Sequence, residues 1–221
     1  MRGMSVTIFD AMPSLGRKLL VAGKGGLNLT HGESMEKFVT RYDGGDRVFW
    51  GNLLNEFNPS ALREWAGGLG IETFQASSGR VYPKEMKAAP LLRRWITRLR
   101  ELGVQIETRH RLVGIKPGRP HELSFSNGVT VHAPAVVFAM GGGSWSRTGS
   151  DGSWVECFAT REIKYRPLAP ANCGWEHAWS AETLALAEGK PLKNIVVSAG
   201  DQQAVGELLV SRYGLEGGAI Y

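Results

Sequence analysis

The chain has 221 residues, of which 43% are hydrophobic and 21% are charged. These fractions are ordinary for a globular protein, so disordered, collagen-like and coiled-coil architectures are excluded. The formal net charge of +5 is mild for this length, and we expect no nucleic-acid partner. No apolar run approaches the roughly 18 residues of a membrane helix, and Asp10 comes too early for a signal peptide. We therefore expect a cytoplasmic protein with no membrane contact.

The glycine content is unusual, because 29 residues are glycine, nearly twice the usual ~7%. Clustered glycine indicates backbone that lies close to another group or adopts unusual angles. Cys157 and Cys173 have no redox or disulfide spacing, and the five histidines have no metal-ligand spacing. We therefore predict no metal site and expect most histidines to be surface or turn residues.

The chain begins with a short β-branched strand over residues 5–9, which ends at Asp10. A glycine-rich stretch over residues 15–30 follows. Helical patterns are predicted over residues 33–42, 46–57 and 59–67. Asp46 and Asn58 stand at the N-cap positions of the last two, and Pro59 stands at a first helical position.

The strongest helical pattern covers residues 89–102, where apolar side chains form one stripe. Short strands are predicted before and after it, over residues 71–74, 80–82, 104–108, 111–115, 122–126 and 129–132. Asn127 and Gly128 form a typical hairpin turn between the last two strands.

An apolar run over residues 135–140 then leads into Gly141, Gly142 and Gly143. Because it is apolar at every position, it is predicted to be a central strand of a sheet. From about residue 161 the pattern changes to short strands, turns and one helix over residues 181–188. We therefore predict two domains, residues 1–160 and residues 161–221.

The glycine cluster at residues 23–26 matches neither common phosphate-binding motif. Lys24 is followed by Gly25 instead of Ser or Thr, and Asn28 stands where a dinucleotide fingerprint has its third glycine. A different combination is more informative. A strand ending in Asp10, a later three-stranded meander and a central strand running into glycines form the layout of an FAD-binding doubly wound domain. An acid at that strand end can accept hydrogen bonds from the adenosine ribose.

The sequence resembles a family of bacterial flavoproteins, the NAD(P)/FAD-dependent oxidoreductases that include BaiN-like and aminoacetone-oxidase-like enzymes. The resemblance covers essentially the whole chain. It is carried by VTIFDAMPSLGRKLLVAGKGGLNLTH, GRVYPKEMKAAPLLRRW, VVFAMGGGSWSRTGSDGSW, PLAPANCGW and GELLVSRYGLEGGAIY. It implies an α/β fold in which a Rossmann-like FAD domain of the glutathione-reductase type is followed by a mainly β insertion domain.

The resemblance also implies a noncovalent FAD site. Asp10 would bind the ribose, and Val113 would lie beside the adenine. The pyrophosphate and flavin would be lined by Arg17, Lys18, Gly23, Gly25, Gly26, Leu27, Asn28 and Thr30. The other side of the cofactor would be followed by Gly141, Gly142, Thr148, Gly149 and Asp151.

The chain departs from the family's pattern in two places. Members of the family open with a strand and a G-x-G-x-x-G turn before the strand that ends in the acid, and they continue beyond the insertion. The resemblance therefore implies a fragment of a longer protein. We expect the parent to transfer hydride or electrons between NAD(P)H and a small organic substrate. The alternative is a catalytically inactive remnant or a miscalled gene product that acts at most as a binding module. The oligomeric state is left open.

Overall fold

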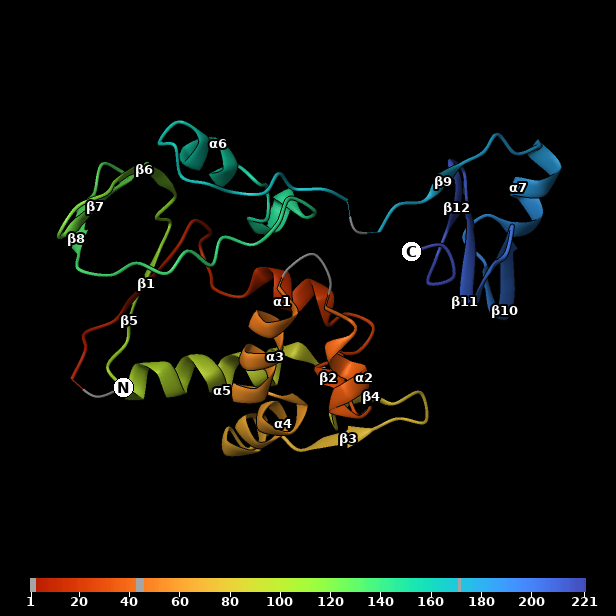
Figure 1. The fold of residues 1–221 in the computed structure, drawn as a ribbon, viewed down its shortest axis with the longest axis horizontal. Coiled ribbons are helices and arrows are strands. Elements are labelled where there is room, and N and C mark those ends of the chain that lie inside the picture. Colours follow the sequence, from red (N-terminus) through yellow and green to blue (C-terminus); the bar gives the residue numbers. More distant parts are fainter. Residues whose placement is uncertain (1–2, 43–45, 171) are drawn as a thin grey trace. The chain divides into compact units, whose positions relative to one another are not determined.

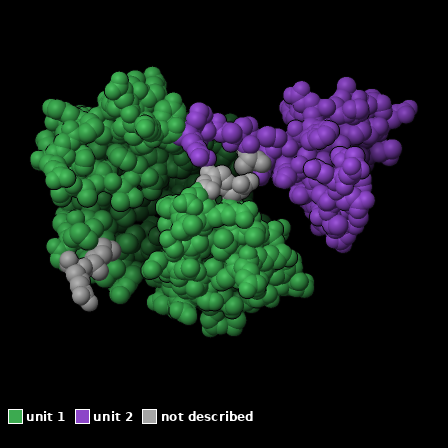
Figure 2. All heavy atoms as spheres, viewed as in Figure 1, with its two compact units in different colours: residues 1–165 green, residues 166–221 purple. Residues whose placement is uncertain are grey.

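The computed structural model describes residues 3–42, 46–170 and 172–221. The chain forms two compact units, Met1–Tyr165 and Arg166–Tyr221 (Figure 2). The sequence pattern placed the change at residues 160–161. The assignment of the two segments to an FAD domain and an insertion domain stays a prediction.

The first unit contains a parallel pair of strands, β1 (Thr7–Asp10) and β5 (Gln105–Thr108). Their register pairs Thr7 with Gln105 and Asp10 with Thr108, so both strands end at the same edge. Beyond the strands, the His110 N–H donates to the carbonyl of Asp10 (2.9 Å). Asp10 therefore lies at the carboxyl edge of the parallel pair, which is where α/β proteins bind their ligands.

Helix α5 (Ala88–Glu101) organises one of the two cores of this unit (Figure 1). Its buried side chains are Ala88, Leu91 and Leu92, and α1 (Arg17–Ala22) packs against it. The predicted apolar stripe is only partly buried, because Trp95 is 39% and Leu102 is 47% exposed. Helix α1 itself was missed by the sequence analysis, which treated its residues as part of a glycine-rich stretch.

Three further helices and a small antiparallel sheet belong to the same unit. The helices are α2 (Met35–Val39), α3 (Arg47–Glu56) and α4 (Pro59–Gly68). Of these helices, α4 contributes Ala66 to the core around α5. The sheet has the order β2 (Thr30–His31), β4 (Arg80–Pro83), β3 (Thr73–Gln75). The predicted N-caps are confirmed, because Asp46 accepts from Val48 N (2.9 Å) and Asn58 accepts from Ala61 N (2.9 Å). Each such cap stabilises its helix by about 1 kcal/mol.

The second core lies under an antiparallel meander of three strands. These are β6 (Leu112–Lys116), β7 (His121–Phe125) and β8 (Thr130–Ala133). The predicted hairpin is confirmed, with Gly128 at φ +84° and Asn127 accepting from Val129 N. Helix α6 (Trp154–Ala159) packs on β6. Phe9 of β1 stacks on Phe125 with the ring centroids 4.6 Å apart, which joins the meander to the parallel pair.

The predicted central strand over residues 135–140 is wrong for this chain, because these residues are in no regular strand. Val137 in the middle of the run is 91% exposed. A parallel strand forms only where a neighbour completes its hydrogen bonds. Within the described part of the chain, β1 pairs with β5 alone, and residues 135–140 pair with neither of these strands. An apolar pattern alone could not show this.

The second unit is an antiparallel sheet with one helix. The strand order is β10 (Pro191–Ala199), β11 (Gln202–Ser211), β12 (Gly214–Glu216), β9 (Trp175–Glu176). Helix α7 (Ala181–Ala187) is capped by Ser180, which accepts from Thr183 N, and it packs on β11. Across the described residues of both units, no helix has the length and apolar character needed to cross a membrane.

Candidate cofactor site

The site is built around Asp10, the last residue of β1. Its side chain is half-buried, and Oδ1 accepts a hydrogen bond from Met12 N (2.8 Å). The carbonyl of Met12 accepts from Arg109 N (3.0 Å), which ties the chain after β1 to the chain after β5. The carboxylate is therefore held in one orientation at the carboxyl edge of the parallel pair.

The segment of residues 141–151 meets this edge. Gly149 adopts φ +96°, and a Cβ added there would lie 2.8 Å from Cγ of Met12. Only glycine accepts both this conformation and this approach. Thr148 lies in a short 3₁₀ helix (Ser146–Thr148), and its hydroxyl donates to the carbonyl of Trp145 (2.8 Å). Gly149 therefore lies against Met12, two residues after Asp10, and Thr148 precedes it in the same turn. The roles of Thr148 and Gly149 at a cofactor stay predictions.

Helix α1 supplies the two basic residues expected at the site. Lys18 donates to Oγ of Ser144 (2.9 Å) and lies 5.0 Å from the ring centroid of Trp145, so α1 contacts the same segment. Arg17 carries a buried Nε that has no hydrogen-bond partner among the described residues. A buried guanidinium N–H without a partner is costly. Of these two basic residues, Arg17 therefore has a buried N–H that lacks an acceptor among the described residues.

Asp151 serves mainly to order the chain around it. Its Oδ2 accepts from Nη1 of Arg111 (2.8 Å), and its Oδ1 accepts from the N–H and the hydroxyl of Ser153 at the start of α6. The hydrogen bond from the Ser153 hydroxyl is the largest cause that lowers the pKa of Asp151, with burial opposing it. Both oxygens are already in use, so this carboxylate is less available to a ligand than that of Asp10.

The glycine loop, residues 23–30, packs against the segment of residues 81–88. A Cβ at Gly23 would lie 2.6 Å from Cβ of Ala88, and one at Gly26, at φ +121°, would lie 2.8 Å from Cε of Met86. These two glycines therefore have packing reasons that do not involve a cofactor. Gly25 differs, because a Cβ added there would meet no heavy atom within 4 Å.

The remaining predicted residues divide by exposure. Leu27 is 4% exposed and belongs to the core around α5, and Thr30 is 9% exposed. Asn28 is exposed between them. Gly141 is exposed and Gly142 has open space where a Cβ would stand. Val113 is 49% exposed beside the register irregularity of β6.

Sequence reasoning missed the residues that hold the expected ones in place. Met12 orients Asp10, Arg111 binds Asp151, and Ser144 and Trp145 bind Lys18. Ser144 and Trp145 lie within the family-like segment, which is the one signal that pointed to them. Nothing in the local sequence pattern distinguishes Arg111 from other surface arginines.

Comparison with known proteins identifies the family. The sequence profile of the HI0933-like protein Rossmann domain matches residues 1–205. The chain belongs to this family. This match confirms the Rossmann-like α/β class expected from the sequence, and HI0933-like Rossmann domains bind FAD. The chain is also 30% identical over 166 residues to a 3-dehydro-bile acid delta(4,6)-reductase of Clostridium scindens. That match covers 75% of this chain and 40% of the relative, so the chain spans less than half of that protein's length.

The residues present fit the FAD that HI0933-like domains bind. A fixed, half-buried carboxylate stands at the strand edge, and the buried Nε of Arg17 lacks an acceptor. Gly25 and Gly142 leave room for close approach to their backbone. Carboxylate, guanidinium and open glycine backbone are the groups that bind a ribose and a pyrophosphate.

Proposed function

We propose that this HI0933-like chain contributes the FAD-binding part of a flavoprotein that transfers hydride or electrons between NAD(P)H and a small organic substrate. The position of Asp10 carries the proposal. Its carboxylate is fixed at the carboxyl edge of the parallel pair, beside the turn at Gly149. The family and the reductase relative support an oxidoreductase in general. The nicotinamide donor is supported by the sequence resemblance alone.

Each part of the site has a separate task in this proposal. Asp10 accepts hydrogen bonds from the ribose hydroxyls of the adenosine, and Val113 provides apolar contact for the adenine. Arg17 neutralises the pyrophosphate, while Lys18 holds the segment of residues 141–151 against α1. Bound flavin supplies the redox chemistry, and the protein supplies orientation and electrostatics. No side chain among the described residues is assigned as a catalytic acid or nucleophile.

The relative from Clostridium scindens is a reductase of a 3-dehydro-bile acid by its name. We carry over to this protein only an organic molecule that accepts hydride, with the matching proton supplied by solvent or by the protein. A protein of this kind is expected in the cytoplasm, as the sequence analysis anticipated.

Comparison of FAD with FMN tests the proposed site directly. FMN has the flavin and one phosphate but lacks the adenosine, so it cannot use Asp10. Titration of the purified protein, followed by flavin fluorescence, should show tighter binding of FAD than of FMN. Equal binding of the two would contradict the proposed role of Asp10. Anaerobic mixing of the flavin-loaded protein with NADH or NADPH then tests the donor, because a competent donor bleaches the flavin absorbance.

A further inference from the structure

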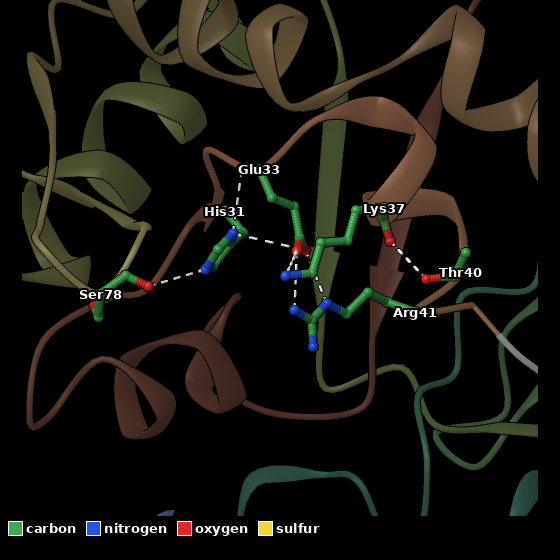
Figure 3. Close-up of polar contacts among 6 residues, drawn as sticks. All are labelled: His31, Glu33, Lys37, Thr40, Arg41 and Ser78. Carbon is green, nitrogen blue, oxygen red and sulfur yellow. Dashed lines mark hydrogen bonds and ion pairs between the residues drawn. The ribbon is translucent and has the colours of Figure 1, made fainter. Parts of the chain in front are cut away.

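His31 follows the glycine loop directly and has a partner for each ring nitrogen (Figure 3). Nδ1 accepts from the backbone N–H of Glu33 (3.2 Å), and Nε2 lies 3.1 Å from the carbonyl of Ser78. A backbone N–H can only donate and a carbonyl can only accept. Both contacts are therefore satisfied together only by the neutral imidazole with its proton on Nε2.

The ring connects three elements of the first unit. His31 belongs to β2, Ser78 lies in the turn between β3 and β4, and Glu33 precedes α2. The turn is shaped to receive the ring, because Gly79 adopts φ +81° and a Cβ there would lie 2.4 Å from Cε1 of His31. Gly32 N also donates to the carbonyl of Gly79 (2.8 Å), so backbone and ring hold the same turn.

Glu33 is fixed in turn by basic groups. Its side chain is 7% exposed, and Arg41 donates to both carboxylate oxygens (2.8 and 2.9 Å). Lys37 lies 3.9 Å from Oε2, and Nδ1 of His31 lies 3.6 Å from Oε1. The hydrogen bond from Arg41 is the largest cause that lowers the pKa of Glu33, while burial opposes it. The carboxylate therefore stays ionised and keeps Glu33 in place beside the ring.

We propose that His31 is a positioning residue for the glycine loop. In the tautomer with the proton on Nε2, it links the end of the loop to the β3–β4 turn and to the start of α2. Leu29 within the loop donates to the carbonyl of Val81 (2.8 Å), so a shift of β4 against β2 would move the loop backbone. The importance of this loop for cofactor binding rests on the proposed function, but the linkage itself does not.

The tautomer can be measured on the 221-residue chain without flavin. Two-bond ¹⁵N–¹H correlation spectra distinguish a protonated from an unprotonated ring nitrogen. The neutral ring of His31 should carry its proton on Nε2 and none on Nδ1. A proton on Nδ1, or rapid averaging of the two tautomers, would overturn the proposal.

Two variants remove one contact each, because their side chains copy different halves of the ring. His31→Asn keeps an acceptor near the position of Nδ1 but cannot reach Ser78. His31→Gln places a donor near the position of Nε2 but loses the acceptor for Glu33 N. Amide hydrogen exchange should therefore accelerate about fivefold to tenfold at Glu33 in His31→Gln and at Gly32 in His31→Asn. General destabilisation would accelerate both amides in both variants, and that outcome would contradict a specific positioning role.

His31→Ala should accelerate exchange at Glu33, Gly32 and Leu29 together. The amide of Leu102 at the far end of α5, which donates to Arg98, should be unaffected. Unchanged exchange at Leu29 in His31→Ala would show that the ring does not position the loop. Because these measurements need no cofactor, their failure is separate from any failure of the proposed FAD site.

Discussion

Replacement of Asp10 by alanine is expected to weaken FAD binding. The carboxylate is a charge-assisted acceptor for ribose hydroxyls, and loss of such bonds costs about 1.5–3 kcal/mol. This corresponds to roughly a tenfold to hundredfold rise in the dissociation constant. Alanine also removes the hydrogen bond from Met12 N that orders the turn after β1. Asp10→Asn separates the two effects, because its amide oxygen still accepts from Met12 N while the negative charge is lost.

The assay is a fluorescence titration of wild-type and variant proteins with FAD and with FMN. Asp10→Asn should weaken FAD binding, with little effect on FMN. Glu107→Ala is the matched control, because Glu107 is an exposed acid on the neighbouring strand β5 and pairs in register with Phe9. Equal FAD affinity in Asp10→Asn and Glu107→Ala, or equal losses of FAD and FMN, would refute the placement of Asp10 at the ribose.

Three further predictions follow from other parts of the site and its surroundings. Gly25→Val should abolish FAD binding in the titration, because the branched side chain fills the space that the cofactor needs, and it should leave the circular dichroism spectrum unchanged, because a Cβ at this position would meet no heavy atom within 4 Å. Gly25→Ala should keep more of the FAD affinity, and equal FAD affinity in the two variants would remove the loop from the site. The lowered pKa of Asp151 means that its stabilising contribution is present above its ordinary pKa of 3.8 and is lost as the pH falls through the lowered value. Asp151→Asn should therefore reduce the loss of unfolding free energy at acid pH, measured by urea unfolding at several pH values. Asp201→Asn is the control, because Asp201 is an exposed acid in the turn between β10 and β11, and it should leave that loss unchanged. Gly79→Ala should lower the free energy of unfolding of the wild-type chain by more than the ~1 kcal/mol of positive-φ strain. In the His31→Ala background the loss should fall to that strain alone. Equal losses in the two backgrounds of this double-mutant cycle would argue against close packing of Gly79 on the His31 ring.

Local signals predicted much of the fold. The caps at Asp46 and Asn58 and the hairpin at Asn127 and Gly128 depend on residues close in sequence, so the sequence contains their whole explanation. The prediction of a strand over residues 135–140 failed for the opposite reason. Its conformation depends on a ladder neighbour distant in sequence, which an apolar pattern cannot reveal.

For the candidate site, the sequence predicted the position of Asp10 at a strand end, because a strand ending in an acid is a local pattern. The role of Asp10 at a cofactor stays a prediction. The packing of Gly23 and Gly26 against Ala88 and Met86 could not be predicted, because it joins segments about 60 residues apart. The linkage through His31 was also missed. The sequence cannot show that this histidine has two partners, because they become visible only when the β3–β4 turn and the glycine loop are placed together.

The chain alone is expected to bind FAD weakly, because β1 has a single ladder partner within the described residues and residues 135–140 form no strand. Copurification of stoichiometric flavin with the 221-residue protein would contradict this expectation. Weak binding still leaves the location of the cofactor open to measurement. It therefore calls for a method that reports individual residues at partial saturation.

Chemical-shift mapping with FAD tests the central claim most directly. The ¹⁵N-labelled chain is titrated with FAD, and the amides that shift are compared with those that shift on addition of FMN. We predict that FAD moves the amides of Asp10, Met12 and Gly149 and that FMN moves them much less. Shifts confined to residues 166–221, or identical shifts with both flavins, would contradict an adenosine site at the carboxyl edge of β1.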